Sequence, residues 1–172
     1  QVQLTQEPGN GTWTQEVILT GIGKIEKGKD TTIVGYAFSK NSEDESKLSW
    51  NNLNNVTETT QTMKVTEGGT YYFWIKDSEG EIYQSNPVEV KNIDRTAPTV
   101  GSIVAKEQNA EGEEYDLTKS PWTDKSVYVE KVDGTDGESG HAETTYTVKK
   151  DGITIYENIK DPVTLEESAI YQ

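Results

Sequence analysis

The chain has 172 residues, a formal net charge of −14 and no cysteine. The negative charge argues against nucleic acid and anionic membranes as partners, because both are bound through Lys and Arg side chains. The absence of cysteine excludes disulfides, thiolate metal sites and cysteine nucleophiles. No apolar run approaches the roughly 18 residues of a membrane span. With four tryptophans and nine tyrosines, the composition is that of a folded, acidic chain and fits a protein working outside the cell.

Short runs of alternating apolar and polar residues, separated by Gly, Pro, Asn and Asp, fill the first half of the chain. Alternation with period 2 predicts strands, and strands at spacings of about 8–12 residues are typical of a β-sandwich. In "TYYFWIKD", we expect Tyr71, Phe73 and Ile75 to share one face of a strand, with Tyr72 and Trp74 on the other. The predicted strands lie near residues 2–7, 15–20, 31–39, 46–50, 60–66, 70–76 and 81–91.

Four segments of the first half recur in the same order in the second half. The matched pairs are "GTWTQEVILT" (11–20) with "SPWTDKSVYVE" (120–130), "VGYAFSKN" (34–41) with "TTYTVKKDG" (144–152), "WNNL" (50–53) with "YENI" (156–159), and "VTEGGTYY" (65–72) with "LEESAIYQ" (165–172). An ordered set of matches of this kind indicates two copies of one module.

The repeat sets the expected domain boundaries. Module 1 is predicted at residues 1–93, a short linker at 94–98 and module 2 at 99–172; Pro98 favours an extended linker. Aligned on module 1, the second module contains no counterpart of residues 73–91, which include its final strand. An unpaired strand edge is a liability, so we expect that the polypeptide continues or that another chain supplies this strand.

The repeated segments resemble a known family. "WTQEVILT" and "WTDKSVYV" open the two copies, "TDGESG" and "TYTV" follow within the second copy, "VTEGGTYYFWIKDSEG" lies near the end of the first, and "NIDRTAPT" joins them. These segments are similar to the bacterial immunoglobulin-like (Big-type) repeat domains of Gram-positive cell-surface proteins. The resemblance implies an all-β chain of two tandem immunoglobulin-like β-sandwich modules, the second incomplete at its C-terminal end. It implies little about activity, because one fold serves many functions.

No residue pattern of a catalytic site is present. The single histidine, His141, lies where the resembling repeats carry an aliphatic residue, and we interpret it as structural or solvent-exposed. Catalysis requires a nucleophile, a base and an orienting group that converge in space. We therefore expect the chain not to be an enzyme and to use no cofactor.

Calcium is the one metal that the sequence suggests. Asp133, Asp136 and Glu138 lie in the Gly-rich "DGTDGESG" and offer the hard oxygen ligands that Ca²⁺ prefers. Their spacing departs from the EF-hand loop, so a solvated turn is the preferred interpretation and no metal site is assigned. Asp94 in the linker is a second calcium candidate, and its alternative is an ordinary linker carboxylate.

Aromatic side chains supply the candidate binding residues. Tyr72 and Trp74 are two residues apart on one face of the predicted strand, where the resembling repeats carry small or polar residues. Such a pair could stack on a sugar or anchor a protein; the alternative is that neighbouring side chains cover it. Trp50 is assigned to the core of the module, and the repeated Trp13 and Trp122 are interpreted as core or edge residues.

These observations predict a non-catalytic, adhesin-type spacer in a bacterial surface or secreted protein, which holds a distal domain away from the cell. Its partners would be other domains of the same polypeptide, with no nucleic acid and no membrane. A second hypothesis is a module that binds a host glycan or receptor through Tyr72 and Trp74. A third is an accessory region of a larger surface hydrolase, with the catalysis elsewhere.

Overall fold

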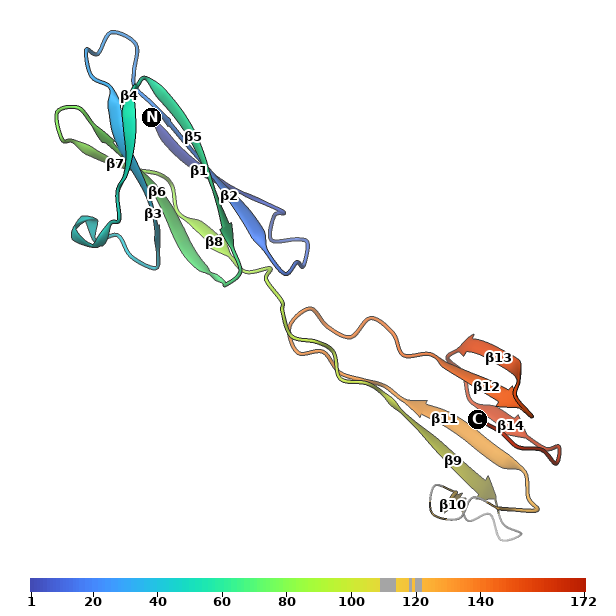
Figure 1. The fold of residues 1–172 in the computed structure, drawn as a ribbon. Helices are drawn as coiled ribbons and strands as arrows, with labels where there is room; N and C mark the ends of the chain where they lie inside the picture. The colour runs from blue at the N-terminus through green and yellow to red at the C-terminus, as the bar shows by residue number, and fades with distance from the viewer. Residues whose placement is uncertain (109–113, 118, 120–121) are drawn as a thin grey trace. The chain divides into compact units, whose positions relative to one another are not determined.

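The structure is a computed structural model (Figure 1). It describes residues 1–108, 114–117, 119 and 122–172. The paired strands form antiparallel sheets, which confirms the all-β class expected from the alternating sequence. Within these described ranges, no helix is both long enough and apolar enough to cross a membrane.

The chain divides into two compact units, Gln1–Arg95 (unit 1) and Thr96–Gln172 (unit 2). The N–H of Asp94 donates to the carbonyl of Thr14 in unit 1 (2.9 Å), whereas the N–H of Thr99 donates to the carbonyl of Thr135 in unit 2 (2.7 Å). The division therefore falls within the residues expected for the linker, 94–98. Positions 120 and 121 of the second repeat lie outside the described residues.

Unit 1 consists of two sheets with a shared core. One sheet has the strand order β1-β2-β5; the other has the order β4-β3-β6-β7, with β8 also paired to β6 (Figure 1). The strands are β1 (Val2–Glu7), β2 (Val17–Lys24), β3 (Ile33–Lys40), β4 (Asn51–Val56), β5 (Glu58–Val65), β6 (Gly69–Asp77), β7 (Ile82–Gln84) and β8 (Val88–Val90). Two antiparallel sheets over one core are consistent with a β-sandwich.

The core of unit 1 is built by the period-2 alternation of these strands. The first sheet contributes four buried side chains and the second contributes five: Leu4, Val17, Leu19 and Val65, then Ile33, Tyr71, Phe73, Ile75 and Val90. The expected inward face of β6 is thereby confirmed. Burying a large apolar side chain stabilises the fold by about 1.5–3 kcal/mol, so this cluster holds the two sheets together.

Gly21 in β2 leaves the space that Phe73 needs. A Cβ atom at Gly21 would lie 2.3 Å from Cγ of Phe73, a distance at which atoms overlap. Phe73 is fully buried and its ring centroid lies 4.9 Å from that of Phe38. A side chain at position 21 would therefore push the two sheets apart.

Two strands predicted in unit 1 differ from those observed. Residues 46–50 are not a strand: a 3-10 helix, η1 (Glu45–Lys47), lies there, and β4 begins only at Asn51. The carboxylate of Asp44 caps η1 by accepting the Ser46 N–H (3.0 Å), a local bond that competes with strand geometry. The strand predicted at 81–91 is split into β7 and β8 at residues 85–87, where Pro87 has no N–H to donate.

Unit 2 contains β9 (Ser102–Gln108), β10 (Glu114–Asp116), β11 (Val127–Val132), β12 (Tyr146–Lys150), β13 (Ile153–Ile159) and β14 (Val163–Leu165). These strands form a sheet of order β10-β9-β11-β14 and a two-stranded ribbon of β12 and β13 (Figure 1). Four buried apolar residues make up the core among the described residues: Val129, Tyr146, Val148 and Leu165. The core of unit 2 is therefore smaller than that of unit 1.

Candidate functional site

Tyr72 and Trp74 lie on the outer face of the β4-β3-β6-β7 sheet of unit 1, opposite to the face that carries Phe73. Their ring centroids are 6.3 Å apart with an interplanar angle of 48°, so the structure brings the predicted pair together. Trp74 is only 2% exposed, however, and Tyr72 is half-buried. Of the two interpretations of the pair, an exposed binding face or a covered one, the covered one therefore holds for Trp74.

Hydrogen bonds from the segment between β3 and β4 explain why this pair is covered. The indole Nε1–H of Trp74 donates to Oγ of Ser39 (2.8 Å), and that hydroxyl donates to the carbonyl of Ser42 (2.8 Å). Farther along the segment, Glu43 accepts a hydrogen bond from Nε2 of Gln84 in β7 (3.2 Å). The segment is thus fastened to β3 and β7, both of which pair with β6.

Tyr72 is held in its neutral form. Burial raises the pKa of Tyr72, and the nearby Glu43 carboxylate raises it further by its negative charge and a hydrogen bond. A neutral phenol beside a carboxylate is suited to donating a hydrogen bond. Tyr72 therefore helps to fasten the covering segment rather than presenting a free ring.

Trp50 lies on the same outer face and not in the core, which corrects its predicted role. The ammonium group of Lys76 is 4.4 Å from the centroid of the Trp50 ring, a cation–π distance. A Cβ atom at Gly35 would meet the edge of this ring at 3.5 Å, so the ring covers the backbone of β3 at that point. Trp50 is half-buried, and its counterpart in the repeat, Tyr156, is exposed.

The repeated tryptophans are exposed in both units. Trp13 is 48% exposed and Trp122 is 85% exposed, so neither is a core residue; of the two predicted roles, core or edge, the core role is wrong. Trp13 follows a turn and precedes the strand that begins at Val17, and Trp122 precedes the strand that begins at Val127. Single exposed aromatic residues are common on protein surfaces and do not by themselves make a site.

The acidic segment of unit 2 has a structural explanation. Asp133 forms an ion pair with Lys131, which lowers the pKa of that carboxyl group. Oδ1 of Asp136 accepts a long bond from the N–H of Glu138 (3.4 Å). No group of three or more His, Cys, Asp or Glu residues that could hold a metal is found among the described positions, and Asp94 joins none.

Gly134 within this segment allows a close approach of two backbones. A Cβ atom there would lie 2.1 Å from the carbonyl oxygen of Thr99. Thr99 and Thr135 are joined by two backbone-to-side-chain bonds, from Thr135 N–H to Oγ1 of Thr99 (2.8 Å) and from Thr99 Oγ1 to the carbonyl of Thr135 (3.0 Å). The absence of a side chain at Gly134 therefore allows the hydrogen bonds between Thr99 and Thr135 to form, and this explains the glycine without a calcium loop.

His141 contacts a hydroxyl group but not in the manner of a catalytic triad. Its Nε2 lies 2.7 Å from Oγ1 of Thr144, and the same Oγ1 accepts the N–H of Gly134 (3.1 Å). In a triad the acid orients the second ring nitrogen of the histidine. Here Asp133 lies near the same hydroxyl group, so both side chains converge on Thr144. This arrangement ties residues 133–144 together and fits the structural interpretation of His141.

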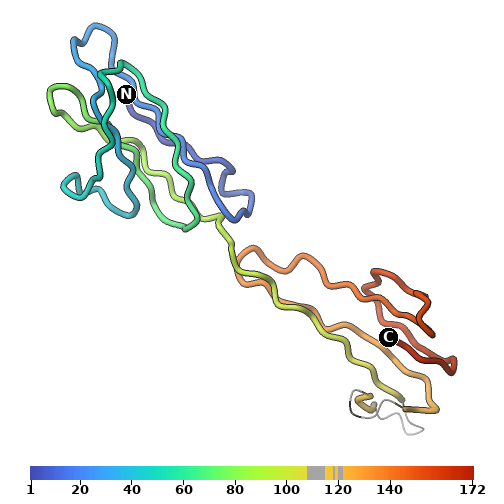
Figure 2. The backbone as a smooth tube through the Cα atoms, in the orientation of Figure 1, coloured from blue at the N-terminus to red at the C-terminus, as the bar shows by residue number. Residues whose placement is uncertain are grey.

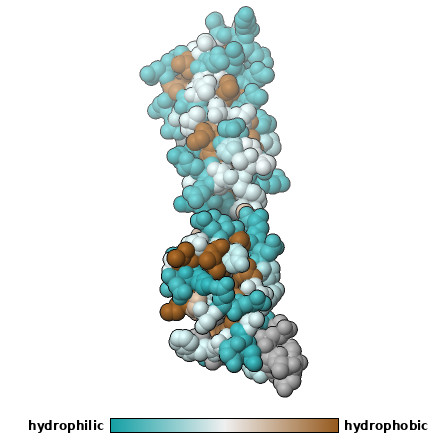
Figure 3. Space-filling model, turned by 90° about the vertical axis from the view of Figure 1, so that its right-hand side faces the viewer, coloured by the Kyte–Doolittle hydropathy of each residue, from teal (hydrophilic) through white to brown (hydrophobic). Residues whose placement is uncertain are grey.

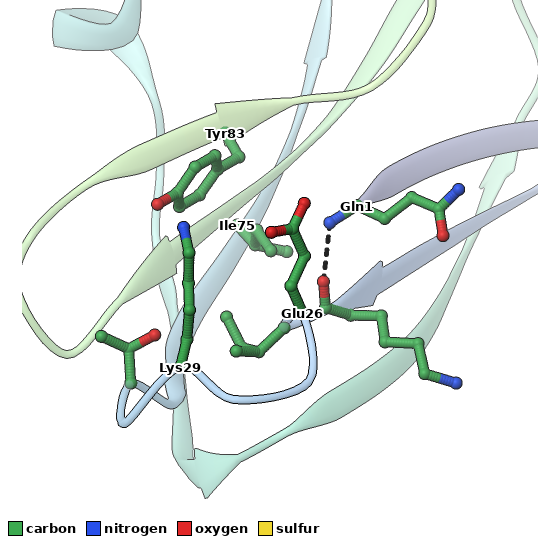
Figure 4. Close-up of a pocket in the computed structure, with 8 residues that line it drawn as sticks. Gln1, Glu26, Lys29, Ile75 and Tyr83 are labelled. Carbon is green, nitrogen blue, oxygen red and sulfur yellow. Dashed lines mark hydrogen bonds between the residues drawn. The ribbon is translucent and has the colours of Figure 1, made fainter.

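A small pocket lies at one end of unit 1 (Figure 4). Its volume is about 110 Å³, and its lining includes Glu26, Lys29, Ile75 and Tyr83. The amino group of Gln1 donates to the carbonyl of Lys24 at its rim (2.7 Å). Ligand sites usually measure about 300–1,000 Å³, so this pocket is too small for one.

Asparagine side chains join two distant segments of unit 1, which the sequence reading missed. Asn92 is 1% exposed, and its Nδ2–H₂ group donates to the carbonyls of Gly9 (2.9 Å) and Thr12 (2.6 Å). Asn10 donates to the carbonyl of Glu89 (2.7 Å) and accepts the N–H of Lys91 (2.9 Å). Asparagine is typical of turns, and nothing in the local sequence distinguishes these residues.

The two segments run parallel. The amide of Asn86 exchanges two bonds with the backbone of Leu4, each of 3.1 Å. At the other end, the N–H of Thr14 donates to the carbonyl of Asn92 (2.9 Å), and Thr14 forms a parallel bridge with Ile93. Position 4 therefore lies beside 86, and position 14 lies beside 92–94. We call residues 4–14 and 86–94, with these bonds, the parallel zipper.

Comparison of the chain with protein-family models, with curated proteins and with solved structures gave no match.

Proposed function

We propose that this chain is a non-catalytic spacer made of two tandem immunoglobulin-like β-sandwich modules of one kind. It belongs to a bacterial surface or secreted protein and presents a distal functional domain. The other domains of the same polypeptide are its partners. The observation that carries the proposal is the parallel zipper of unit 1.

The zipper suits a protein that bears load. A pull between the beginning and the end of unit 1 draws segment 4–14 towards its N-terminus and segment 86–94 towards its C-terminus. Because the segments run parallel, this pull shears the bonds of Asn10, Asn86 and Asn92 together rather than breaking them one at a time. When several bonds share the load, the barrier to unfolding is higher. A higher barrier lowers the unfolding rate, and this rate governs unfolding under force.

Two further features support a spacer outside the cell. The net charge of −14 keeps a densely displayed domain soluble and away from anionic surfaces. The order β9-β11-β14 in unit 2 is similar to β1-β2-β5 in unit 1, with β10 added at the edge, and matched contacts occur in both units. Lys40 pairs with Glu67 as Lys150 pairs with Glu167, and Tyr71 bonds to the carbonyl of Glu67 as Tyr171 bonds to that of Glu167.

The rival proposals have less support. Binding of a glycan or receptor by Tyr72 and Trp74 requires the segment at residues 41–50 to move, since Trp74 is buried and bonded to Ser39. The hydrolase proposal places catalysis outside these residues and predicts the same properties for this chain as a spacer does.

Single-molecule pulling of unit 1, through handles at residues 1 and 95, tests the spacer proposal. For Asn92→Ala we expect unfolding at a given force to be about tenfold faster. Loss of a buried hydrogen-bonding group costs about 1–3 kcal/mol, and about 1.4 kcal/mol corresponds to a factor of ten. The matched control is Asn54→Ala, which alters an exposed asparagine in β4 outside the zipper. Equal unfolding rates for Asn92→Ala and the unaltered protein would contradict a load-bearing zipper.

A further inference from the structure

One edge of β12 in unit 2 carries little strand pairing. β13 lies along the other edge, and the described residues place only 170–172 beside this one (Figure 2). The backbone groups of Lys149 and Gln172 exchange two bonds (2.9 and 3.0 Å), and the N–H of Asp151 donates to the carbonyl of Ile170 (2.8 Å). We call the remainder of this edge, from Val148 back to Tyr146, the open edge.

The backbone of the open edge is directed away from β13. Both backbone groups of Lys149 point towards Gln172, and successive residues of a strand alternate the direction of these groups. The N–H and C=O of Thr147 therefore point to the same side as those of Lys149. They form a template on which a further antiparallel strand can pair.

In unit 1 the corresponding place is filled by β6. The contacts of Lys40, Glu67 and Tyr71 match those of Lys150, Glu167 and Tyr171, which fixes the register of the two units. In this register Val148 corresponds to Phe38, and Tyr146 corresponds to Tyr36. β6 places Phe73 beside Phe38 and Ile75 beside Tyr36.

Apolar side chains are exposed around this ribbon. Ile153 is 71% exposed, and Ile155, Tyr156 and Ile170 are exposed as well. In Figure 3, apolar residues (brown) gather in the lower part of the view, which is unit 2. Ile170 lies on the same side of β12 as the open edge, whereas Ile153, Ile155 and Tyr156 belong to β13 on its other side.

We propose that the open edge of unit 2 binds an extended segment in antiparallel orientation, with the chemistry of β6. Such a partner places an aromatic residue opposite Val148 and an aliphatic residue opposite Tyr146, as in the "FWI" of residues 73–75. Main-chain bonds give the affinity, and the alternate side chains that reach the small core of unit 2 give the specificity. The inference rests on the proposed equivalence of the two modules.

A second copy of the chain fits the open edge less well than such a segment. Symmetric pairing of two β12 strands would need the backbone groups of Lys149, and Gln172 already holds these. It would also bring Lys149 and Lys150 of both copies to one ladder, where their positive charges repel. The occupant of the open edge is therefore a strand other than the same edge of another copy.

The test is to add a peptide of residues 73–91 to the 172-residue protein and to follow hydrogen exchange of the Thr147 amide by NMR. These residues include the remainder of β6 together with β7 and β8, and in unit 1 β8 pairs with residues 69–71 of β6. We expect the exchange of Thr147 to slow by at least about tenfold at a saturating peptide concentration, because its N–H becomes bonded. A peptide with Phe73→Asn and Ile75→Asn should have no such effect.

Two variants of the protein make the result specific to one edge. Thr147→Pro removes the donor of the open edge and should abolish peptide binding. Thr154→Pro is the matched control: Thr154 pairs with Lys149 across the ribbon, so its own backbone groups point away from β12. Near-identical far-ultraviolet circular dichroism spectra would establish that both variants fold.

Three results would overturn the inference. The first is an unchanged exchange rate of Thr147 at millimolar peptide. The second is equal slowing by the two peptides. The third is a concentration-dependent dimer, abolished by Thr147→Pro, that forms without any effect of the peptide. The unfolding rate of Asn92→Ala at a given force tests only the spacer proposal, and the exchange rate of Thr147 tests only the open edge. Failures of the two proposals are therefore distinguishable.

Discussion

The two units differ most in what lies beside one strand of each. β3 in unit 1 has β4 on one side and seven paired residues of β6 on the other. β12 in unit 2 has β13 on one side and, in the described chain, only residues 170–172 on the other. The buried apolar cores differ as well: among the described residues, the cluster has nine members in unit 1 and four in unit 2. Three of the nine, Tyr71, Phe73 and Ile75, belong to β6.

The largest expected effect distinguishes the two cores. Phe73→Ala should destabilise unit 1 by about 3–5 kcal/mol, because it leaves a cavity between the sheets. Val148→Ala in unit 2 should cost only about 1–2 kcal/mol, since two buried carbons are lost at about 0.8 kcal/mol each. Differential scanning calorimetry of the 172-residue protein should show the larger shift in the unit 1 transition. A larger shift for Val148→Ala would contradict the difference in core size.

A smaller effect is expected for the segment that covers Trp74. Ser39→Ala leaves the indole Nε1–H of Trp74 buried without its acceptor, at a cost of about 1–3 kcal/mol. Lys149→Ala, at the corresponding position of unit 2, is the matched control and should change stability little because Lys149 is exposed. Urea unfolding measures both variants. If Ser39→Ala were as stable as the unaltered protein, the account of the covered aromatic pair would be wrong.

The smallest expected effect is a pH dependence that both units share. Burial raises the pKa of Tyr71 and the pKa of Tyr146 above the ordinary value of 10.0. The folded state therefore favours the neutral phenol. This contribution to stability is fully present below about pH 10 and is lost as the pH rises through the raised values in the folded protein.

Thermal melts between about pH 9 and about pH 12 measure this loss. Tyr71→Phe should remove part of the alkaline loss from the unit 1 transition alone, and Tyr146→Phe should do the same for unit 2. An identical alkaline loss in Tyr71→Phe and the unaltered protein would show that Tyr71 is not the titrating group.

Local patterns predicted the parts of the fold that depend on local geometry. The period-2 alternation of Tyr71, Phe73 and Ile75 placed all three on the inward face, and the structure agrees. The same reasoning failed at residues 46–50, where the cap by Asp44 stabilises η1 instead. The bond from Asp44 is also a short-range feature. It is harder to recognise in the sequence than an alternating pattern, because the residues around it are polar as well.

The surroundings of Trp74 and Asn92 depend on contacts between residues that are far apart in the sequence. A local sequence pattern does not reveal such contacts. The prediction placed Trp74 on the correct face, but the alternation of the strand does not contain its burial or its bond to Ser39. Asn92 donates to three carbonyl groups that lie 80 to 84 positions away in the sequence, and it had no distinguishing local signal. Such residues become visible only when the partner segment is in place.

Hydrogen exchange at two corresponding amides tests the comparison most directly. Ala37 of β3 pairs with Trp74 of β6, whereas Thr147 of β12 lies on the open edge. In the 172-residue protein alone, the amide of Ala37 should exchange at least about a hundredfold more slowly than that of Thr147, because only Ala37 is enclosed between two strands. Similar protection of the two amides would contradict both the register that relates the units and the open edge of unit 2.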